Sequence, residues 1–282
     1  MDIKEIRKLI IQAIAADDIL MGLLVLKGGN ALDIVHRFNL RTSLDLDFSI
    51  SGDFENTEEV KNRLFDSLNH RFDSKGLVTI DEKFLAKPKG GAEDPTWGGY
   101  RAEFKLVNKK LIDQLKDDLD GLRRNSLSIG DSNNSRIFSI EISKYEWIKG
   151  AELSELDGFK FRVYTLPMIA VEKLRAICQQ MQEYPLNKTP KPRARDFFDI
   201  YSVTELIPKM WQEEEVEDLI YEMFATKKVS LDLINLIKNT KDFHQSDWNS
   251  VVSAANQSLE SFDYYFDSVM KIIEELDSFW IK

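Results

Sequence analysis

The sequence predicts an α/β (α+β) fold, in which a mixed, strongly twisted sheet forms an N-terminal domain over residues 1–160 and helices form a C-terminal domain over residues 161–282. Two observations favour this division. In the first domain, short runs alternate between apolar and polar residues, as strands with one buried face do, and helical patterns lie between them. In the second domain, leucines, phenylalanines and tyrosines recur at helical intervals.

The elements of the first domain follow from these two periodicities. Asn56 is a suitable N-cap for the helix that follows it, and a segment rich in glycine, proline and lysine predicts a surface loop. In chain order, we expect a helix over 3–20, a strand over 44–50, a helix over 56–72, a strand over 77–84, the loop over 87–99, a strand over 100–107, a helix over 109–122 and a strand over 136–145.

The second domain begins with a helix signal. Thr165 is a suitable N-cap and Pro167 suits the first helical turn. Further along, Phe262, Tyr265 and their helical neighbours form an apolar stripe that is typical of a core. We expect helices over 167–182, 193–201, 213–224, 230–237 and 249–280.

Composition excludes several classes of protein. With 282 residues, of which 43% are hydrophobic, the chain can bury a sizeable core. The single cysteine, Cys178, excludes an internal disulfide framework, and three scattered histidines leave no Cys/His zinc cluster. No signal-peptide core or membrane-spanning run is found, so the expected location is cytoplasmic, with no membrane partner.

A glycine pair marks the first candidate site. The apolar run 23–26 ends at Gly28 and Gly29, and residues 30–38 continue with helical spacing, which predicts strand, tight turn and helix. Glycines allow the backbone to approach a bulky anion, and the first N–H groups of a helix are unpaired and carry the positive end of its dipole. The turn therefore suits a phosphate group.

Two aspartates form the second candidate site. In the strand over 44–50, side chains alternate between faces, so Asp45 and Asp47 project from the same face. Neighbouring carboxylates repel each other unless a cation lies between them, and magnesium prefers such oxygen ligands, completed by water and substrate phosphates. The alternative interpretation is two solvated acids on an edge strand. A phosphate-binding turn followed by paired carboxylates favours metal-assisted nucleotidyl transfer.

Four further charged residues stand out. Glu141 lies in mid-strand among small and apolar residues, where an unpaired carboxylate is costly unless a cation holds it. Asp196 and Asp199 are three residues apart and so share one helical face. Lys173 lies on the preceding predicted helix, and its alternative role is an ion pair with Asp196 between the two helices. For Glu141, the alternative is a surface ion pair with Lys144 or a nearby arginine.

These motifs carry a resemblance to a known family. The segments Lys27–Leu32 (Lys-Gly-Gly-Asn-Ala-Leu) and Arg41–Phe48 (Arg-Thr-Ser-Leu-Asp-Leu-Asp-Phe) resemble the AbiEii/AbiGii-type nucleotidyltransferase toxins of the polymerase β nucleotidyltransferase superfamily. Two later segments, Glu172–Ala176 and Arg195–Asp199, match the lysine and acidic motifs of the same family. The resemblance covers about residues 20–202, with the four motifs in order.

The resemblance implies roles for individual residues. Asp45 and Asp47 would hold Mg²⁺, with Mn²⁺ as an alternative, and Glu141 matches the third acid of the superfamily, which is usually aspartate. Lys173 would stabilise charge on the triphosphate, and Asp196 would activate or position the acceptor hydroxyl. The residues implied to bind the NTP substrate or support its site are Lys27, Gly28, Gly29, Asn30, Arg41, Ser43, Arg195 and Asp199.

The implied function is transfer of a nucleoside monophosphate from NTP to an acceptor, with pyrophosphate released. What is known of similar proteins implies an RNA acceptor, the 3′ end of tRNA, and a toxin of a bacterial toxin–antitoxin or phage-defence (abortive infection) system with a cognate antitoxin protein. Two alternatives stay open: nucleotidylation of a protein or small molecule, and a catalytically silent binding module on the same fold. A glycosyltransferase using Asp-x-Asp is disfavoured, since it leaves Gly28, Gly29 and Lys173 unexplained.

Charge distribution is compatible with an RNA partner. The net charge is −10, but residues 211–282 hold fifteen acidic and six basic residues, so the rest of the chain is close to neutral. Basic clusters near residues 105–110, 123–124 and 188–195 permit contacts with a phosphate backbone. For any single cluster, a solvated face is the alternative interpretation.

Overall fold

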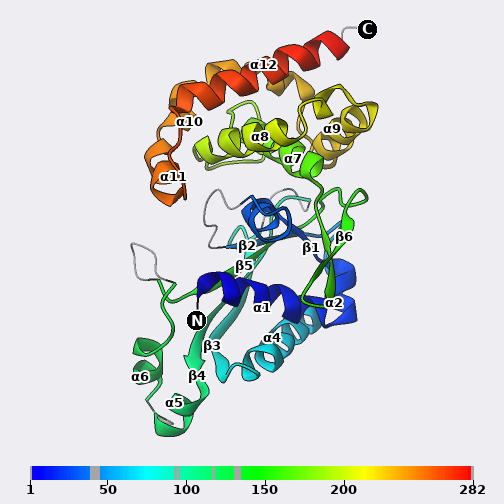
Figure 1. Cartoon of the computed structure of the whole chain (residues 1–282). Coiled ribbons are helices and arrows are strands. Elements are labelled where there is room, and N and C mark those ends of the chain that lie inside the picture. The colour runs from blue at the N-terminus through cyan, green and yellow to red at the C-terminus, as the bar shows by residue number, and fades with distance from the viewer. Residues whose placement is uncertain are drawn as a thin grey trace. The chain divides into compact units, whose positions relative to one another are not determined.

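The protein folds into two compact units, with the change from the first to the second between Val163 and Tyr164. The structure, a computed structural model, describes residues 2–38, 45–91, 94, 96–115, 118–129 and 135–280. Residues 277–280 are described by their backbone only. The first unit holds the sheet and the second is helical (Figure 1).

Within the described residues, seven strands form one mixed sheet in the order β3-β4-β5-β2-β1-β7-β6. The pairs β1/β7 and β2/β5 are parallel, whereas β1/β2, β3/β4, β4/β5 and β6/β7 are antiparallel. This confirms the predicted fold class. The strands are β1 (Val25–Lys27), β2 (Leu46–Ser49), β3 (Leu77–Lys87), β4 (Gly99–Asn108), β5 (Phe138–Ser143), β6 (Glu152–Leu156) and β7 (Phe159–Val163).

Helices of the first unit largely match the predicted segments, with two divisions. The predicted helix over 109–122 forms as two helices, Lys109–Gln114 and Leu119–Arg124, because Asp118 accepts from the N–H of Gly121 and caps the second one. The predicted helix over 3–20 is split because Asp17 accepts hydrogen bonds from the N–H groups of Ile19 and Leu20 and so caps a second helix. Asn56 caps the helix after β2, as expected, by accepting from the N–H of Glu59 at 3.1 Å. The helices are α1 (Ile3–Ala15), α2 (Asp18–Leu23), α3 (Gly28–Asn30), the π-helical turn η1 (Ala31–Val35), α4 (Thr57–Asp73), α5 (Lys109–Gln114) and α6 (Leu119–Arg124).

The sheet has one apolar and one polar face in its centre. Leu46, Phe48 and Phe104 are buried, and the ring of Phe72 on α4 lies 6.0 Å from that of Phe104. Helix α1 packs beside α4 (Figure 1). The opposite face carries the alternate residues of the same strands, which include Asp47. Helix packing on one side therefore leaves the other side of the central strands available for polar groups.

The hairpin β6–β7 is an element that the sequence reasoning missed. Its turn is Asp157-Gly158, with φ of 51° and 86°, which suits the two-residue turns that match the twist of a hairpin. The Asp-Gly pair between alternating residues was the available signal. Strand β7 pairs with β1 in parallel and so adds a strand to the sheet next to the one that ends at the glycine turn. It ends at Val163, directly before the second unit.

The second unit packs helices around an aromatic core. Thr165 caps α7 as expected, and Phe197 of α8 stacks on Phe266 of α12 with 5.3 Å between ring centroids. The predicted continuous helix over 249–280 is divided, and the N–H of Glu260 between its two parts donates to the hydroxyl of Tyr265. The elements are α7 (Leu166–Cys178), α8 (Ala194–Leu206), η2 (Met210–Gln212), α9 (Glu214–Thr226), η3 (Leu231–Asn239), α10 (Lys241–Gln245), α11 (Trp248–Ala254) and α12 (Phe262–Trp280). In the part of the chain that the structure describes, no helix has the length and apolar character needed to cross a membrane.

Candidate active site

The glycine turn lies against the paired aspartates. Gly28 follows β1 with φ of +68°, a conformation that L side chains rarely adopt. A Cβ placed at Gly28 would lie 2.7 Å from Oδ2 of Asp47, so a side chain here would displace that carboxylate. Helix α3 begins at the same residue. The sequence therefore needs glycine at this point for both the backbone conformation and the position of Asp47.

Asn30 fastens the turn to its surroundings. Its side chain is fully buried, accepts from Arg7 at 2.7 Å and donates to the main-chain oxygen of Asp45 at 2.5 Å. These contacts hold the first turn of α3 beside the start of β2. The side-chain amide of Asn30 is thus hydrogen-bonded within the protein. A role of Asn30 in binding phosphate stays a prediction, and it would depend on the main-chain N–H.

Strand register aligns four charged residues across the polar face. Lys27 of β1 is paired with Asp47 of β2, Asp47 with Glu141 of β5, and Glu141 with Arg101 of β4. Residues paired directly across neighbouring strands project from the same face. Asp45 lies on this face too, and its carboxylate accepts a hydrogen bond from the Ser139 hydroxyl. The three predicted metal ligands are therefore on one face of adjacent strands.

The electrostatics of Glu141 reflect this crowding. Burial raises the pKa of Glu141, and Asp47 and Asp45 raise it further, against the opposing effect of Arg101. Nε of Arg101 lies 3.3 Å from Oε1 of Glu141. The arginine pair proposed as an alternative for Glu141 is present, whereas Lys144 pairs with Asp53 at 2.7 Å instead.

The donor set fits magnesium in kind. Asp45, Asp47 and Glu141 supply hard oxygen ligands, and magnesium commonly uses one or two protein carboxylates with water and substrate phosphates. Burial is the main cause of the raised pKa of Glu141, and Asp47 and Asp45 add to it by repulsion, which a cation would relieve. Among the described residues, no group of three or more His, Cys, Asp or Glu side chains is already arranged to hold a metal ion.

Other residues assigned to NTP binding have varied positions. Lys27 is buried, with Nζ 3.1 Å from the Ser143 hydroxyl and 3.6 Å from Oε1 of Glu146. Gly29 lies in α3 directly after Gly28. Arg41 and Ser43 lie outside the described residues.

In the second unit, Lys173 and two aspartates form a buried ion network. Nζ of Lys173 lies 2.9 Å from Oδ1 of Asp196 and 2.7 Å from Oδ2 of Asp199, and the three residues are only 4%, 3% and 2% exposed. The ion pair between helices that the sequence offered as an alternative is thus present. It joins α7 to α8 and leaves a role in catalysis as a prediction.

Arg193, which the sequence reasoning did not include in the site, completes this network. Its Nε contacts the Asp196 carboxylate. Burial alone would raise the pKa of Asp196, but Arg193 and Lys173 outweigh it and hold that pKa well below its usual range. Asp196 is therefore a persistent anion. A weakly basic carboxylate of this kind suits the positioning of a substrate group better than proton abstraction.

Residues from the acidic C-terminal segment hold the start of α8. The N–H of Arg193 donates to Nδ1 of His244 at 3.0 Å, and the N–H of Ala194 donates to Oδ1 of Asp247 at 3.1 Å. Burial raises the pKa of Asp247, against the opposing effects of the Ala194 N–H and of the nearby Arg195. These side chains satisfy N–H groups at the helix N-terminus that would otherwise be unpaired. Sequence spacing gave no signal for contacts about fifty residues apart.

His244 should make the stability of the second unit depend on pH. Burial lowers its pKa to about 4, below the usual value of about 6.5. The folded state therefore favours neutral His244, so its contribution is present above pH 6.5 and is lost as pH falls toward 4. We expect the free energy of unfolding to fall by about 3 kcal/mol over this window.

Chemical denaturation at a series of pH values measures this effect. His244→Asn keeps an acceptor near the position of Nδ1 but cannot titrate in this range. The variant should lose most of the slope between pH 6.5 and 4, whatever its absolute stability. An unchanged slope in the variant would assign the pH dependence to other groups.

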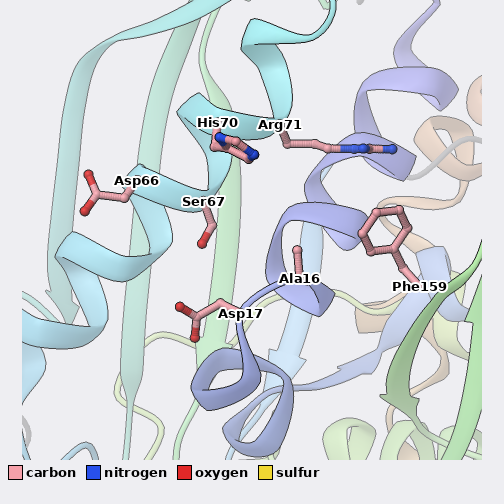
Figure 2. Close-up of a pocket in the computed structure, with 7 residues that line it drawn as sticks. All are labelled: Ala16, Asp17, Asp66, Ser67, His70, Arg71 and Phe159. Carbon is pink, nitrogen blue, oxygen red and sulfur yellow. The ribbon is translucent and has the colours of Figure 1, made fainter.

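A cavity of about 360 Å³ lies elsewhere in the first unit (Figure 2). It is lined by α4, by the turn between α1 and α2, and by Phe159 of β7. Arg71 lies over the Phe159 ring at 4.7 Å and donates to Gln12, and Asp17 pairs with Arg63 at 3.0 Å. The cavity therefore belongs to the helix-covered side of the sheet, and these charged groups of its lining have partners within the fold.

Comparison with known proteins identifies the family. A family model described as nucleotidyl transferase AbiEii toxin, type IV toxin–antitoxin system, matches residues 10–270. The chain belongs to the AbiEii family. The match confirms the resemblance drawn from the four motifs, and it extends into the C-terminal helices, where the motifs are absent. No curated protein sequence matches the chain.

The chain is also similar to solved structures. A Helicobacter pylori protein described as a nucleotidyltransferase has a TM-score of 0.48 and 17% identity, over 98% of this chain and 96% of that one. JHP933 from Helicobacter pylori has a TM-score of 0.40 and 16% identity, over 88% and 94%. An antigenic nucleotidyltransferase-like protein from Paracoccidioides brasiliensis has a TM-score of 0.39 and 15% identity, over 82% and 91%.

Proposed function

We propose that this AbiEii-family chain transfers a nucleoside monophosphate from NTP to a hydroxyl group of RNA, at the 3′ end of tRNA. The acceptor oxygen bonds to the α-phosphorus, the bond from that phosphorus to the β-phosphate oxygen breaks, and pyrophosphate leaves. The hydroxyl proton passes to water. The observation that carries the proposal is the alignment of Asp47 and Glu141 on adjacent strands, beside Asp45 and against Gly28.

Residues of the first unit would bind the substrate and its metal. Asp45 and Asp47 would hold Mg²⁺ or Mn²⁺, with Glu141 as a third ligand. When bound, the metal neutralises charge on the phosphates and on the leaving group. The turn at Gly28 and Gly29 opens the short helix α3, and the main-chain N–H groups at a helix start would suit the triphosphate.

Residues of the second unit would complete the reaction. Lys173 would stabilise charge that develops on the leaving group, a role that matches its Glu-Lys-Leu motif. Asp196 would orient the acceptor hydroxyl, because its lowered pKa makes it a poor base at neutral pH. Arg195 and Asp199 would support this arrangement. The convergence of the two residue sets on one polyphosphate is part of the proposal.

The distribution of basic residues bears on an RNA acceptor. Lys105 and Arg123 both pair with Asp81, and Lys109 pairs with Asp73, so this cluster is largely neutralised within the fold. In the segment before α8, Lys188 and Lys191 are exposed. Because this segment leads directly into Arg195, we favour it for contacts with an RNA backbone.

Family membership supports a biological role as well. A toxin of a type IV toxin–antitoxin system should slow growth when it is produced alone, and a cognate antitoxin protein should relieve that effect. Incubation with each α-labelled NTP, Mg²⁺, total RNA and cell lysate tests the chemistry. Label in tRNA supports the proposal, label in protein or a small molecule indicates a different acceptor, and no label with no NTP binding favours a silent binding module.

Gly28→Ala should strongly reduce labelling while lowering the free energy of unfolding only modestly. The added Cβ meets the Asp47 carboxylate at 2.7 Å, and the positive φ adds about 1–2 kcal/mol of strain. We expect a loss of labelling of about 10²-fold or more, since small displacements of catalytic groups cost that much. Gly52→Ala is the matched control, because a Cβ added at Gly52 would meet nothing within 4 Å. Equal activity in the two variants would contradict the role of Gly28.

A further inference from the structure

Arg101 lies beside the predicted metal ligands, although neither the sequence motifs nor the family match points to it. It is on β4, directly opposite Glu141 of β5. Nε of Arg101 lies 3.0 Å from Oε1 of Glu103 and 3.3 Å from Oε1 of Glu141. One guanidinium group therefore serves two carboxylates, one of which is a predicted metal ligand.

We propose that Arg101 is an internal counter-cation that competes with a divalent cation for Glu141. The inference rests on the proposed function, because that function requires the metal. In the absence of metal, Arg101 balances the carboxylates of the polar face and keeps Glu141 in place. When a divalent cation binds, Glu141 exchanges one positive partner for another. Arg101 thereby sets how tightly the protein binds metal before NTP arrives.

The contacts of Arg101 suit such an exchange. Its Nε is buried, yet it makes no hydrogen bond of good geometry with any residue that the structure describes. Charge rather than directional hydrogen bonding therefore holds Nε against the two carboxylates. The side chains of Arg101 and Glu141 are each about one-third exposed, at 32% and 34%, so the ion pair is partly screened by water and weak enough to be exchanged.

Glu103 is the second carboxylate that pairs with Arg101. It is on the same face of β4, and its side chain is only 18% exposed. If Glu141 turns to a metal ion, Glu103 still pairs with Arg101, so the guanidinium group keeps a partner. Lys27, which is aligned with Asp47 on this face, contacts Ser143 and Glu146. Lys87 also favours the charged form of Glu141, but less than Arg101 does. Arg101 forms an ion pair with Glu141 and therefore opposes metal binding there directly.

Titration with Mn²⁺ alone, followed by electron paramagnetic resonance of unbound Mn²⁺, tests the proposal without any turnover. Arg101→Gln should tighten Mn²⁺ binding by about 2–5-fold, the range expected for the loss of a partly exposed ion pair. Glu103→Gln should weaken binding by a similar factor, because it leaves Arg101 to Glu141 alone. The two substitutions therefore shift the affinity in opposite directions.

Lys105→Gln is the matched control for loss of a positive charge. Lys105 is on the same face of β4, but it pairs with Asp81 at 2.9 Å rather than with a predicted metal ligand. The affinity of the Lys105→Gln protein for Mn²⁺ should differ from that of the parent by less than twofold. Thermal unfolding of each variant checks that the sheet is intact, and Arg101→Lys, which keeps the charge, should restore most of the parent affinity.

The outcomes separate this inference from the proposed function. If the parent protein binds Mn²⁺ and Asp47→Asn removes binding, the metal site stands. Unchanged or weaker binding by Arg101→Gln would then overturn the role of Arg101 alone. If the parent protein binds no Mn²⁺, or if Asp47→Asn binds it normally, both the metal site and the competition at Glu141 are wrong.

Discussion

Asp47→Asn should reduce NTP-dependent labelling by about 10²–10³-fold, the order expected when several kilocalories of charge stabilisation are lost. Asp47 lies between Glu141 and the glycine turn of the proposed site. It is paired with Glu141 across the parallel strands β2 and β5, and its carboxylate contacts the turn at Gly28. An amide of the same shape keeps this packing but is a much weaker metal ligand.

The fold should tolerate this change. Asp47 raises the pKa of Glu141, so removing its charge relieves repulsion on the polar face. We therefore expect an unfolding temperature equal to or above that of the parent. Glu155→Gln, an exposed carboxylate on β6, is the control and should keep full activity. A fully active Asp47→Asn protein would refute the assignment of the metal ligands.

Strand periodicity predicted the polar face from the sequence only in part. Alternation was enough to put Asp45 and Asp47 on one side, because period two is a local property of the chain. The strand over 100–107 was interpreted through its apolar face, which is indeed buried. The position of Arg101, on the other face, follows only from the strand register, which pairs it with Glu141. Register depends on which strands pair, and the order β4-β5-β2-β1 is not a local property.

The helical unit shows a similar limit. Spacing correctly put Asp196 and Asp199 on one face of α8, and the alternative of an ion pair with Lys173 followed from the two helices being neighbours. His244 and Asp247 were beyond reach, since they come from later helices that fold back on the start of α8. Such capping from a distant segment leaves no short-range pattern, because the sequence near Arg193 has no suitable capping side chain of its own.

Lys173→Met should be the most destabilising single change in the network. It leaves the carboxylates of Asp196 and Asp199 buried with one fewer cation, and breaking a buried pair in this way costs about 3–5 kcal/mol. Denaturant unfolding of the second unit measures the loss. Labelling would fall as well, but that result alone would not separate catalysis from stability, since an unfolded unit is inactive whatever Lys173 does.

The double variant Lys173→Met, Asp199→Asn separates the two. It removes one charge of each sign, so Arg193 and Asp196 remain as a balanced pair. Neutrality should restore a large part of the stability lost in Lys173→Met, because no uncompensated carboxylate is left buried. Labelling should not return, since a thioether cannot stabilise charge on the leaving pyrophosphate. Recovery of turnover together with stability would instead show that Lys173 only holds α7 to α8, and would leave the triphosphate to residues of the first unit.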